Sequence, residues 1–126
     1  MGEIFRNAWW IVQQETGASF ARLVRTSVPF SDMSEAGRAT QDLLPALRGW
    51  KRILLDFRGG PPGRNDTEFE SGSRSWRETL AKTFERRAVL VKSAAGKLQV
   101  KRLNGGGEAF LVTQLEDEAI RFLSDG

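Results

Sequence analysis

Two arginines and several hydrogen-bond donors gather where a predicted strand gives way to a predicted helix. A short apolar run consists of Ile53, Leu54, Leu55 and Phe57, and the glycines and prolines of residues 59–63 cannot continue it as a strand. Asn65 stands three residues before Glu68, which is the spacing of a helix capping box. The free N–H groups and the dipole of a helix N-terminus favour an anion, and guanidinium groups bind carboxylate or phosphate in a bidentate manner. The predicted anion-binding site therefore consists of Arg58, Gly63, Arg64, Asn65, Asp66 and Thr67.

The same stretch also allows an interpretation without a ligand. Asp66 and Glu68 are close enough in sequence to pair with Arg64, and Arg58 would then be solvated. Asp56 could act as a general base or as a magnesium ligand. A carboxylate at the end of a strand also accepts backbone N–H bonds from the following turn, and an acid at a helix start is favoured by the dipole alone. We therefore predict no catalytic and no metal-ligating residue.

The residue types that are absent exclude most of the usual catalytic chemistry. The 126 residues include neither histidine nor cysteine. A histidine general base, a Ser-His-Asp triad, an imidazole metal ligand, a thiolate nucleophile and a disulfide are therefore excluded. No apolar run approaches the roughly eighteen residues of a membrane span, and the first residues lack the apolar core of a signal peptide. We expect a cytoplasmic protein that is not an enzyme and uses no cofactor.

Basic residues are in slight excess, with 19 lysines and arginines against 16 acids. Six of the basic residues lie in one stretch that contains no acid between Glu85 and Glu108. A surface that binds single-stranded nucleic acid would also need aromatic side chains for stacking, and this stretch has none. We interpret the stretch as a solvated strand end and one polar helix face, and we expect no nucleic-acid partner. The six residues are Arg86, Arg87, Lys92, Lys97, Lys101 and Arg102.

Apolar runs and helical periodicities alternate along the chain. They predict a single α/β domain over residues 1–126, with the order ββαβαβαβα and a mixed, mostly parallel sheet that begins with an N-terminal hairpin. Pro45 should kink the first helix or end it early. The predicted strands are residues 9–15, 20–26, 51–57, 88–91 and 109–113. The predicted helices are residues 36–47, 66–84 and 98–103, and a last helix that begins at a Thr113–Glu116 capping box. Residues 93–96 are predicted to form a turn.

The tryptophans divide between the predicted core and a predicted contact surface. Trp9 and Trp10 should point to opposite faces of the sheet, so that one is exposed to a partner, unless both pack beneath Ile4 and Phe5. The predicted partner-docking residues are Trp9, Trp10, Asp56 and Gly59. The predicted core contains Leu54, Leu55, Phe69, Trp76, Leu80, Val89, Val91, Phe110 and Leu123.

The order of elements resembles the STAS domain, and in particular the SpoIIAA-like branch, which is related in fold to CRAL-TRIO lipid-binding domains. The fragments that carry the resemblance are LLDFRG, GRNDTEFE, VLVKSAAGKLQVKRL and FLVTQLEDEAIRFL. The resemblance implies a bacterial module like the anti-sigma-factor antagonists, which carry Asp, any residue, Ser or Thr, and Gly at this strand end. Asp56 and Gly59 match that pattern, but Arg58 occupies the place of the phosphorylated hydroxyl. The resemblance therefore does not extend to a phosphoryl switch at this position.

Two functions follow as expectations. The first is a non-enzymatic regulatory module that docks a protein partner, with homodimer formation left open. The second is a domain that binds a small anion or a lipid-like amphipathic ligand through Arg58 to Glu68. A deep apolar pocket behind Arg58 and Arg64 would favour the ligand, whereas a filled core with an exposed tryptophan or leucine would favour docking.

Overall fold

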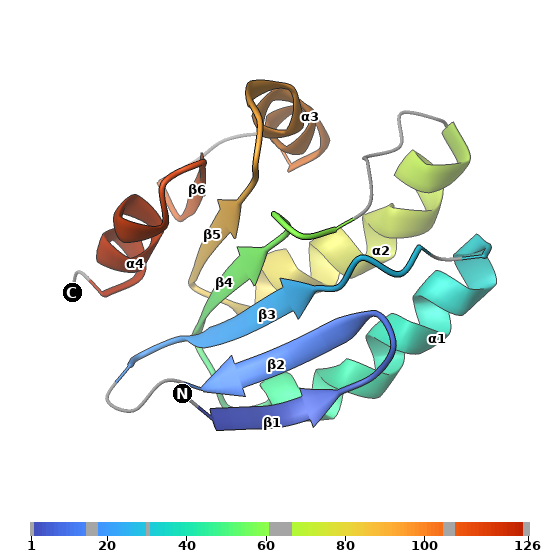
Figure 1. Ribbon diagram of the computed structural model, residues 1–126, viewed down its shortest axis with the longest axis horizontal. Helices are drawn as coiled ribbons and strands as arrows, with labels where there is room; N and C mark the ends of the chain where they lie inside the picture. Colours follow the sequence, from blue (N-terminus) through green and yellow to red (C-terminus); the bar gives the residue numbers. More distant parts are fainter. Residues whose placement is uncertain (1, 15–17, 30, 61–66, 105–107, 125–126) are drawn as a thin grey trace.

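A six-stranded sheet forms the centre of the protein in the computed structural model, which describes residues 2–14, 18–29, 31–60, 67–104 and 108–124 (Figure 1). The strands are β1 (Gly2–Arg6), β2 (Trp10–Gln14), β3 (Ala21–Arg25), β4 (Arg52–Asp56), β5 (Arg86–Leu90) and β6 (Phe110–Thr113). They lie side by side in chain order, antiparallel from β1 to β3 and parallel from β3 to β6. The predicted α/β class, with one domain and a mixed sheet that starts antiparallel, is confirmed.

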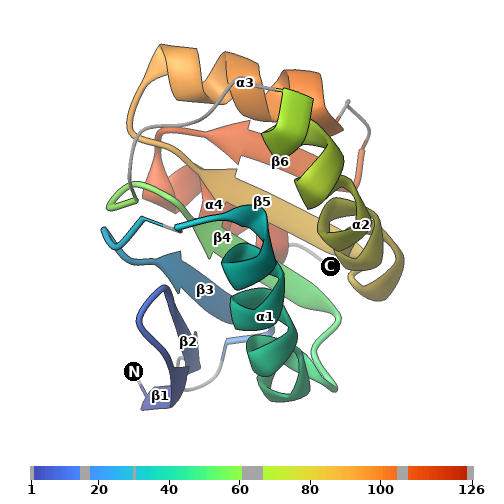
Figure 2. The same ribbon diagram turned by 90° about the vertical axis from the view of Figure 1, so that its right-hand side faces the viewer.

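The helices connect the parallel strands and follow the last one. They are α1 (Met33–Leu43), the 3₁₀ turn η1 (Leu44–Leu47), α2 (Thr67–Thr83), α3 (Ala94–Asn104) and α4 (Glu116–Ser124). Figure 2 shows α1 and α2 in front of the sheet and α4 behind it. No helix within the described ranges is both long and apolar enough to cross a membrane.

Strand β1 was not predicted, and its presence moves the hairpin away from the edge of the sheet. Gly2 to Arg6 pair antiparallel with β2, with a bulge between Glu3 and Phe5. The sequence signal is weak because only Ile4 and Phe5 are large and apolar among these five residues. At the other edge lies β6.

Local residues determine where α1 ends and where α3 begins. Pro45 ends α1 as expected, because the chain changes to a 3₁₀ turn at Leu44. Helix α3 begins at Ala94, so the predicted turn over residues 93–96 is wrong. Ser93 caps this helix, since its Oγ accepts a hydrogen bond from the Gly96 N–H at 3.1 Å.

Each face of the sheet carries its own apolar core. The larger core lies between the sheet and α1, η1 and α2, and the smaller one lies between the sheet and α4. Among the predicted core residues, Leu54, Leu55, Leu80, Val89, Val91 and Leu123 are buried, and Trp76 and Phe110 are partly buried. The side chain of Phe69 lies outside the described part of the structure.

Candidate functional site

Four charged side chains meet where β3, β4 and the start of α4 come together. Arg22 lies opposite Leu54 in the register of β3 and β4, so Arg22, Leu54 and Asp56 share the face that α4 covers. Asp56 is the last residue of β4, and Glu116 is the first residue of α4. Because parallel strands end at the same edge of a sheet, this topology brings together residues that are far apart in sequence. We call Arg22, Asp56, Arg58 and Glu116 the ionic cluster.

The two arginines of the ionic cluster share both carboxylates. Asp56 Oδ1 accepts hydrogen bonds from Arg58 N at 3.2 Å and Arg58 Nε at 3.0 Å. Asp56 Oδ2 accepts from Arg58 Nη2 at 2.8 Å and lies 3.5 Å from Arg22 Nη1. Glu116 Oε1 accepts from Arg22 Nη1 at 2.8 Å and from Arg58 Nη2 at 2.9 Å. Two positive and two negative charges are thus balanced within one contact network.

Both acids of the ionic cluster are held in their charged form. Burial raises the pKa of Asp56, but hydrogen bonds from Arg58 and the nearby charges of Arg58 and Arg22 outweigh it, so the pKa lies below its ordinary value. The hydrogen bond from Arg22 lowers the pKa of Glu116 against a smaller effect of burial. A carboxylate with a lowered pKa and occupied oxygens is a poor proton acceptor at neutral pH. The observed role of Asp56 is therefore to hold the two arginines.

We expect the ionic cluster to lose its stabilising effect in acid. A carboxyl group whose pKa is lowered by folding stabilises the protein above the pKa of the unfolded chain, about 4 for Asp and Glu, and loses that effect as the pH falls through the folded value. The urea midpoint of Glu116→Gln should therefore fall less than that of the wild type between about pH 5 and pH 3. Asp117→Asn, an exposed neighbour in the same helical turn, is the control. Parallel curves for all three proteins would contradict the prediction.

The predicted anion site is only partly described, and its described guanidinium is occupied by carboxylates. Arg58 contacts Asp56 and Glu116, so its guanidinium is paired with carboxylates and is not directed at an empty anion site, while its side chain is 39% exposed. Gly63, Arg64, Asn65 and Asp66 lie outside the described residues, and Thr67 is described only as the start of α2.

Glu116 was predicted to form a capping box with Thr113, and this prediction is wrong. Thr113 Oγ1 instead accepts a hydrogen bond from the Leu115 N–H at 3.1 Å, and the Glu116 carboxylate binds the two arginines. Long-range charge pairs override local capping here because a carboxylate bonded to two guanidinium groups gains more than one bonded to a single N–H group.

The predicted docking residues differ in their exposure. Trp10 is only 4% exposed, and its ring centroid lies 5.5 Å from that of Trp76 and 6.1 Å from that of Phe57. Trp9 is partly buried and packs against the same core cluster as Trp10, so the expectation of opposite faces is wrong. The reason is that Trp9 precedes β2, where the alternation of side chains does not yet apply. Asp56 is buried, and Gly59 alone of the four is exposed.

The start of the glycine-rich loop lies against Arg25. The guanidinium carbon of Arg25 lies 5.3 Å from the centroid of the Trp10 ring, and Arg25 Nη1 donates to Thr26 O at 2.9 Å. A Cβ atom on Gly60 would lie 3.0 Å from Arg25 Cγ, whereas one on Gly59 would come no nearer than 3.8 Å to Arg25 O. Gly60 thus allows the chain to cross directly over a buried arginine stem.

Gly60→Ala is therefore expected to lower the free energy of unfolding by roughly 1 kcal/mol or more, the scale of an overpacked contact. The matched variant Gly59→Ala should be neutral or slightly stabilising, because alanine reduces the entropy of the unfolded chain where the native backbone accepts it. Urea denaturation of both variants checks this difference. Equal midpoints would show that Arg25 moves aside at no cost.

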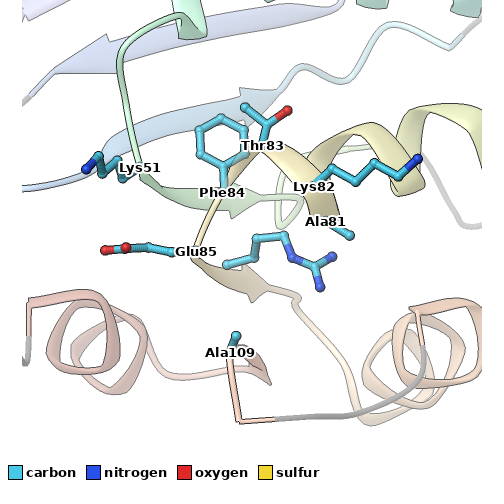
Figure 3. Close-up of a pocket in the computed structure, with 8 residues that line it drawn as sticks. Lys51, Ala81, Lys82, Thr83, Phe84, Glu85 and Ala109 are labelled. Atoms are coloured by element: carbon cyan, nitrogen blue, oxygen red, sulfur yellow. The ribbon is translucent and has the colours of Figure 1, made fainter.

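Two open hollows lie at opposite ends of the parallel strands. One, of about 400 Å³, lies at the amino ends of β4 and β5 and is bounded by the end of α2 (Figure 3). The other, of about 360 Å³, lies beside the start of α4. In the described ranges, no three His, Cys, Asp or Glu side chains are grouped so that they could hold a metal ion. The residues of the first hollow are Lys51, Ala81, Lys82, Thr83, Phe84, Glu85, Arg87 and Ala109; those of the second are Gln114, Leu115, Glu116, Asp117, Glu118 and Arg121.

The fold and the ionic cluster together define an α/β domain whose last helix is bound by charge to the carboxyl ends of its strands. No family model matches this chain, and no curated protein matches it either.

Proposed function

We propose that this chain is a non-enzymatic regulatory module that docks a protein partner, similar to the STAS and SpoIIAA-like domains of the bacterial cytoplasm. The observation that carries the proposal is Leu115, which is 62% exposed at the edge where the parallel strands end. A single exposed leucine is ordinary on a protein surface. This one, however, lines an open hollow in which the acids Asp117 and Glu118 outnumber the basic Arg121, while Glu116 is already bound to two arginines. An apolar side chain flanked by a basic group would complement that hollow.

The ionic cluster supports docking because it holds this edge in one shape. Arg58 bonds to Glu116, so the residues beside that contact, Gly59 on one side and Leu115 on the other, are fixed relative to each other. A surface that is ordered before binding loses less entropy when a partner binds. Arg58 stands where STAS antagonists carry their hydroxyl, so the proposal does not include a phosphoryl switch at this position.

The alternative of a small anionic or amphipathic ligand has less support. The Arg58 guanidinium bonds to two carboxylates, and a ligand would have to displace them. An amphipathic ligand would need apolar space between sheet and helices. Large side chains of both cores are fully buried in the described residues, among them Leu23, Leu43, Ile53, Leu54, Leu90 and Leu123.

The test compares wild type with Leu115→Asp and with Leu98→Asp, a control leucine on α3 that is 70% exposed. Proteins retained by immobilised wild type and by Leu98→Asp, but lost with Leu115→Asp, are purified and titrated by calorimetry against all three chains. We expect saturable binding that Leu115→Asp weakens at least tenfold. Equal retention by the three chains contradicts docking through Leu115. A rise in melting temperature with phosphate or fatty acid, and no partner, would favour the ligand alternative.

A further inference from the structure

The hollow at the amino ends of β4 and β5 lies at the opposite end of the strands from Leu115, and its charge is different. The last turn of α2 forms one wall, and the first residues of the strands form the floor (Figure 3). Three of its residues are basic, namely Lys51, Lys82 and Arg87, and one is acidic, Glu85. The acid is already bound, because Glu85 Oε1 accepts a hydrogen bond from Arg52 Nε at 3.0 Å. The hollow therefore has an excess of positive charge.

Arg87 is the cation of the hollow whose charge is partly buried. It is partly buried, and its guanidinium carbon lies 4.8 Å from the centroid of the Phe110 ring. Within the described residues, its guanidinium makes no hydrogen bond or ion pair besides this ring contact. Burial lowers the pKa of Arg87, which shows that the charge is partly desolvated without a compensating acid. A guanidinium that stacks on a ring through its face keeps its N–H edge for a carboxylate.

The two lysines extend the positive charge to both ends of the hollow. Lys51 and Lys82 are exposed, and neither forms an ion pair within the part of the chain that is described. In Figure 3 the two ammonium groups point away from each other at opposite ends of the hollow. Two features oppose an anion: the C-terminal dipole of α2 beside Lys82, and the exposed Glu108, which precedes Ala109 at the rim. Three cations against these partial and exposed charges still leave the hollow basic.

The arrangement selects the kind of anion. A compact ion would need the positive groups to converge, and here the ammonium groups of Lys51 and Lys82 point away from each other. Single-stranded nucleic acid would need an exposed ring for stacking. The aromatic side chain that lines the hollow, Phe84, is 4% exposed, and the neighbouring Phe110 ring is stacked against Arg87. An extended chain that carries carboxylates at intervals fits a row of separated cations and an otherwise small-residue surface.

We propose that this hollow binds an extended acidic peptide segment of another protein, with Arg87 holding a carboxylate at its centre and Lys51 and Lys82 holding further carboxylates at its ends. The surface is separate from the one around Leu115, and neither depends on the other.

The test measures binding of a fluorescein-labelled decaglutamate peptide to the 126-residue chain by anisotropy at low salt. The double variant Lys51→Ala, Lys82→Ala should weaken binding about twofold to thirtyfold, the combined effect of two exposed charge contacts. The double variant Lys92→Ala, Lys97→Ala removes the same charge from the other end of β5 and the first turn of α3, and it should change affinity less than twofold.

Two further variants separate this site from general charge and from the Leu115 surface. Arg87→Gln should weaken the peptide more than Arg87→Lys, because lysine keeps the charge but loses the bidentate fork. Leu115→Asp should bind the peptide as the wild type does, so that failure of either surface leaves the other testable. Thermal melting confirms that each variant is folded. The proposal is overturned if wild type does not bind the peptide, if the two lysine pairs lose affinity equally, or if a thymidine decanucleotide binds more tightly.

Discussion

Asp56→Ala is expected to lower the free energy of unfolding by about 2–4 kcal/mol. Removing one partner of a buried ion pair leaves an uncompensated charge, which typically costs about 3–5 kcal/mol. The side chains of Arg22 and Asp56 are only 8% and 9% exposed, so this cost applies to Arg22. The lower end of the range allows for Glu116, which keeps its 2.8 Å contact with Arg22 in the variant. Urea denaturation at pH 7, with circular dichroism as the readout, measures the loss.

A double-mutant cycle shows whether the loss comes from the stranded charge. Arg22→Met combined with Asp56→Ala should lose clearly less than the sum of the two single variants, because the methionine leaves no buried charge behind. Asp42→Ala, an exposed aspartate in α1, should change stability by less than about 0.5 kcal/mol. Strict additivity in the cycle would mean that Arg22 and Asp56 do not interact energetically, and the loss in Asp56→Ala would then not come from a stranded Arg22 charge.

The inner strands could be predicted from the sequence because each contains a run of apolar residues that indicates a buried strand without any knowledge of its neighbours. Residues such as Ile53, Leu54 and Leu55 are apolar in succession, which is typical of a strand buried on both faces, and all three are buried. The same reasoning found the inward face of α4, where Ala119 and Leu123 are buried. It failed for β1, because an edge strand with one half-covered face has little apolar pattern to detect.

The ionic cluster could not have been predicted from local spacing. Asp56 and Arg58 are two residues apart, but Arg22 is 34 residues from Asp56, and Glu116 is 58 residues from Arg58. Only the sheet register and the position of α4 bring these side chains together. Glu116 was interpreted as part of a capping box with Thr113, and this local interpretation gave no reason to expect long-range contacts with the two arginines. One usable signal was Arg22, a charged residue at an inward phase of a strand that is otherwise mostly apolar.

Arg87 illustrates a different limit. The sequence placed it among six basic residues and interpreted all of them as a solvated surface. The structure separates them, because the Arg87 side chain is partly buried and stacked on Phe110, whereas Lys92 and Lys101 are exposed. Phe110 lies 23 residues further along the chain and becomes a neighbour only because β6 pairs with β5 in the register Arg87↔Phe110. Charge composition cannot distinguish an exposed cation from one that packing has partly desolvated.

Trp10→Ala is the second variant with a large expected effect, a loss of about 3–5 kcal/mol in the free energy of unfolding. Trp10 lies at the start of β2 and is almost completely buried. Its ring contacts Trp76 of α2, Phe57 beyond β4 and the guanidinium of Arg25, so its removal would open a cavity shared by three elements. Such a site cannot collapse easily, because strand β2 is fixed on both sides by β1 and β3. Chemical denaturation followed by circular dichroism measures the effect.

Trp10→Phe and Trp76→Ala identify the cause of that loss. Phenylalanine retains most of the buried ring area, so Trp10→Phe should lose clearly less than Trp10→Ala. Trp76 is only partly buried, and its removal should therefore also cost less than the removal of Trp10. If Trp10→Ala lost less than about 1 kcal/mol, the indole would have to be on the surface in solution, and Trp10 would regain its predicted place as a docking residue. A large loss in Trp10→Ala together with a small one in Trp10→Phe would instead show that β2 and α2 are held together mainly by buried ring area.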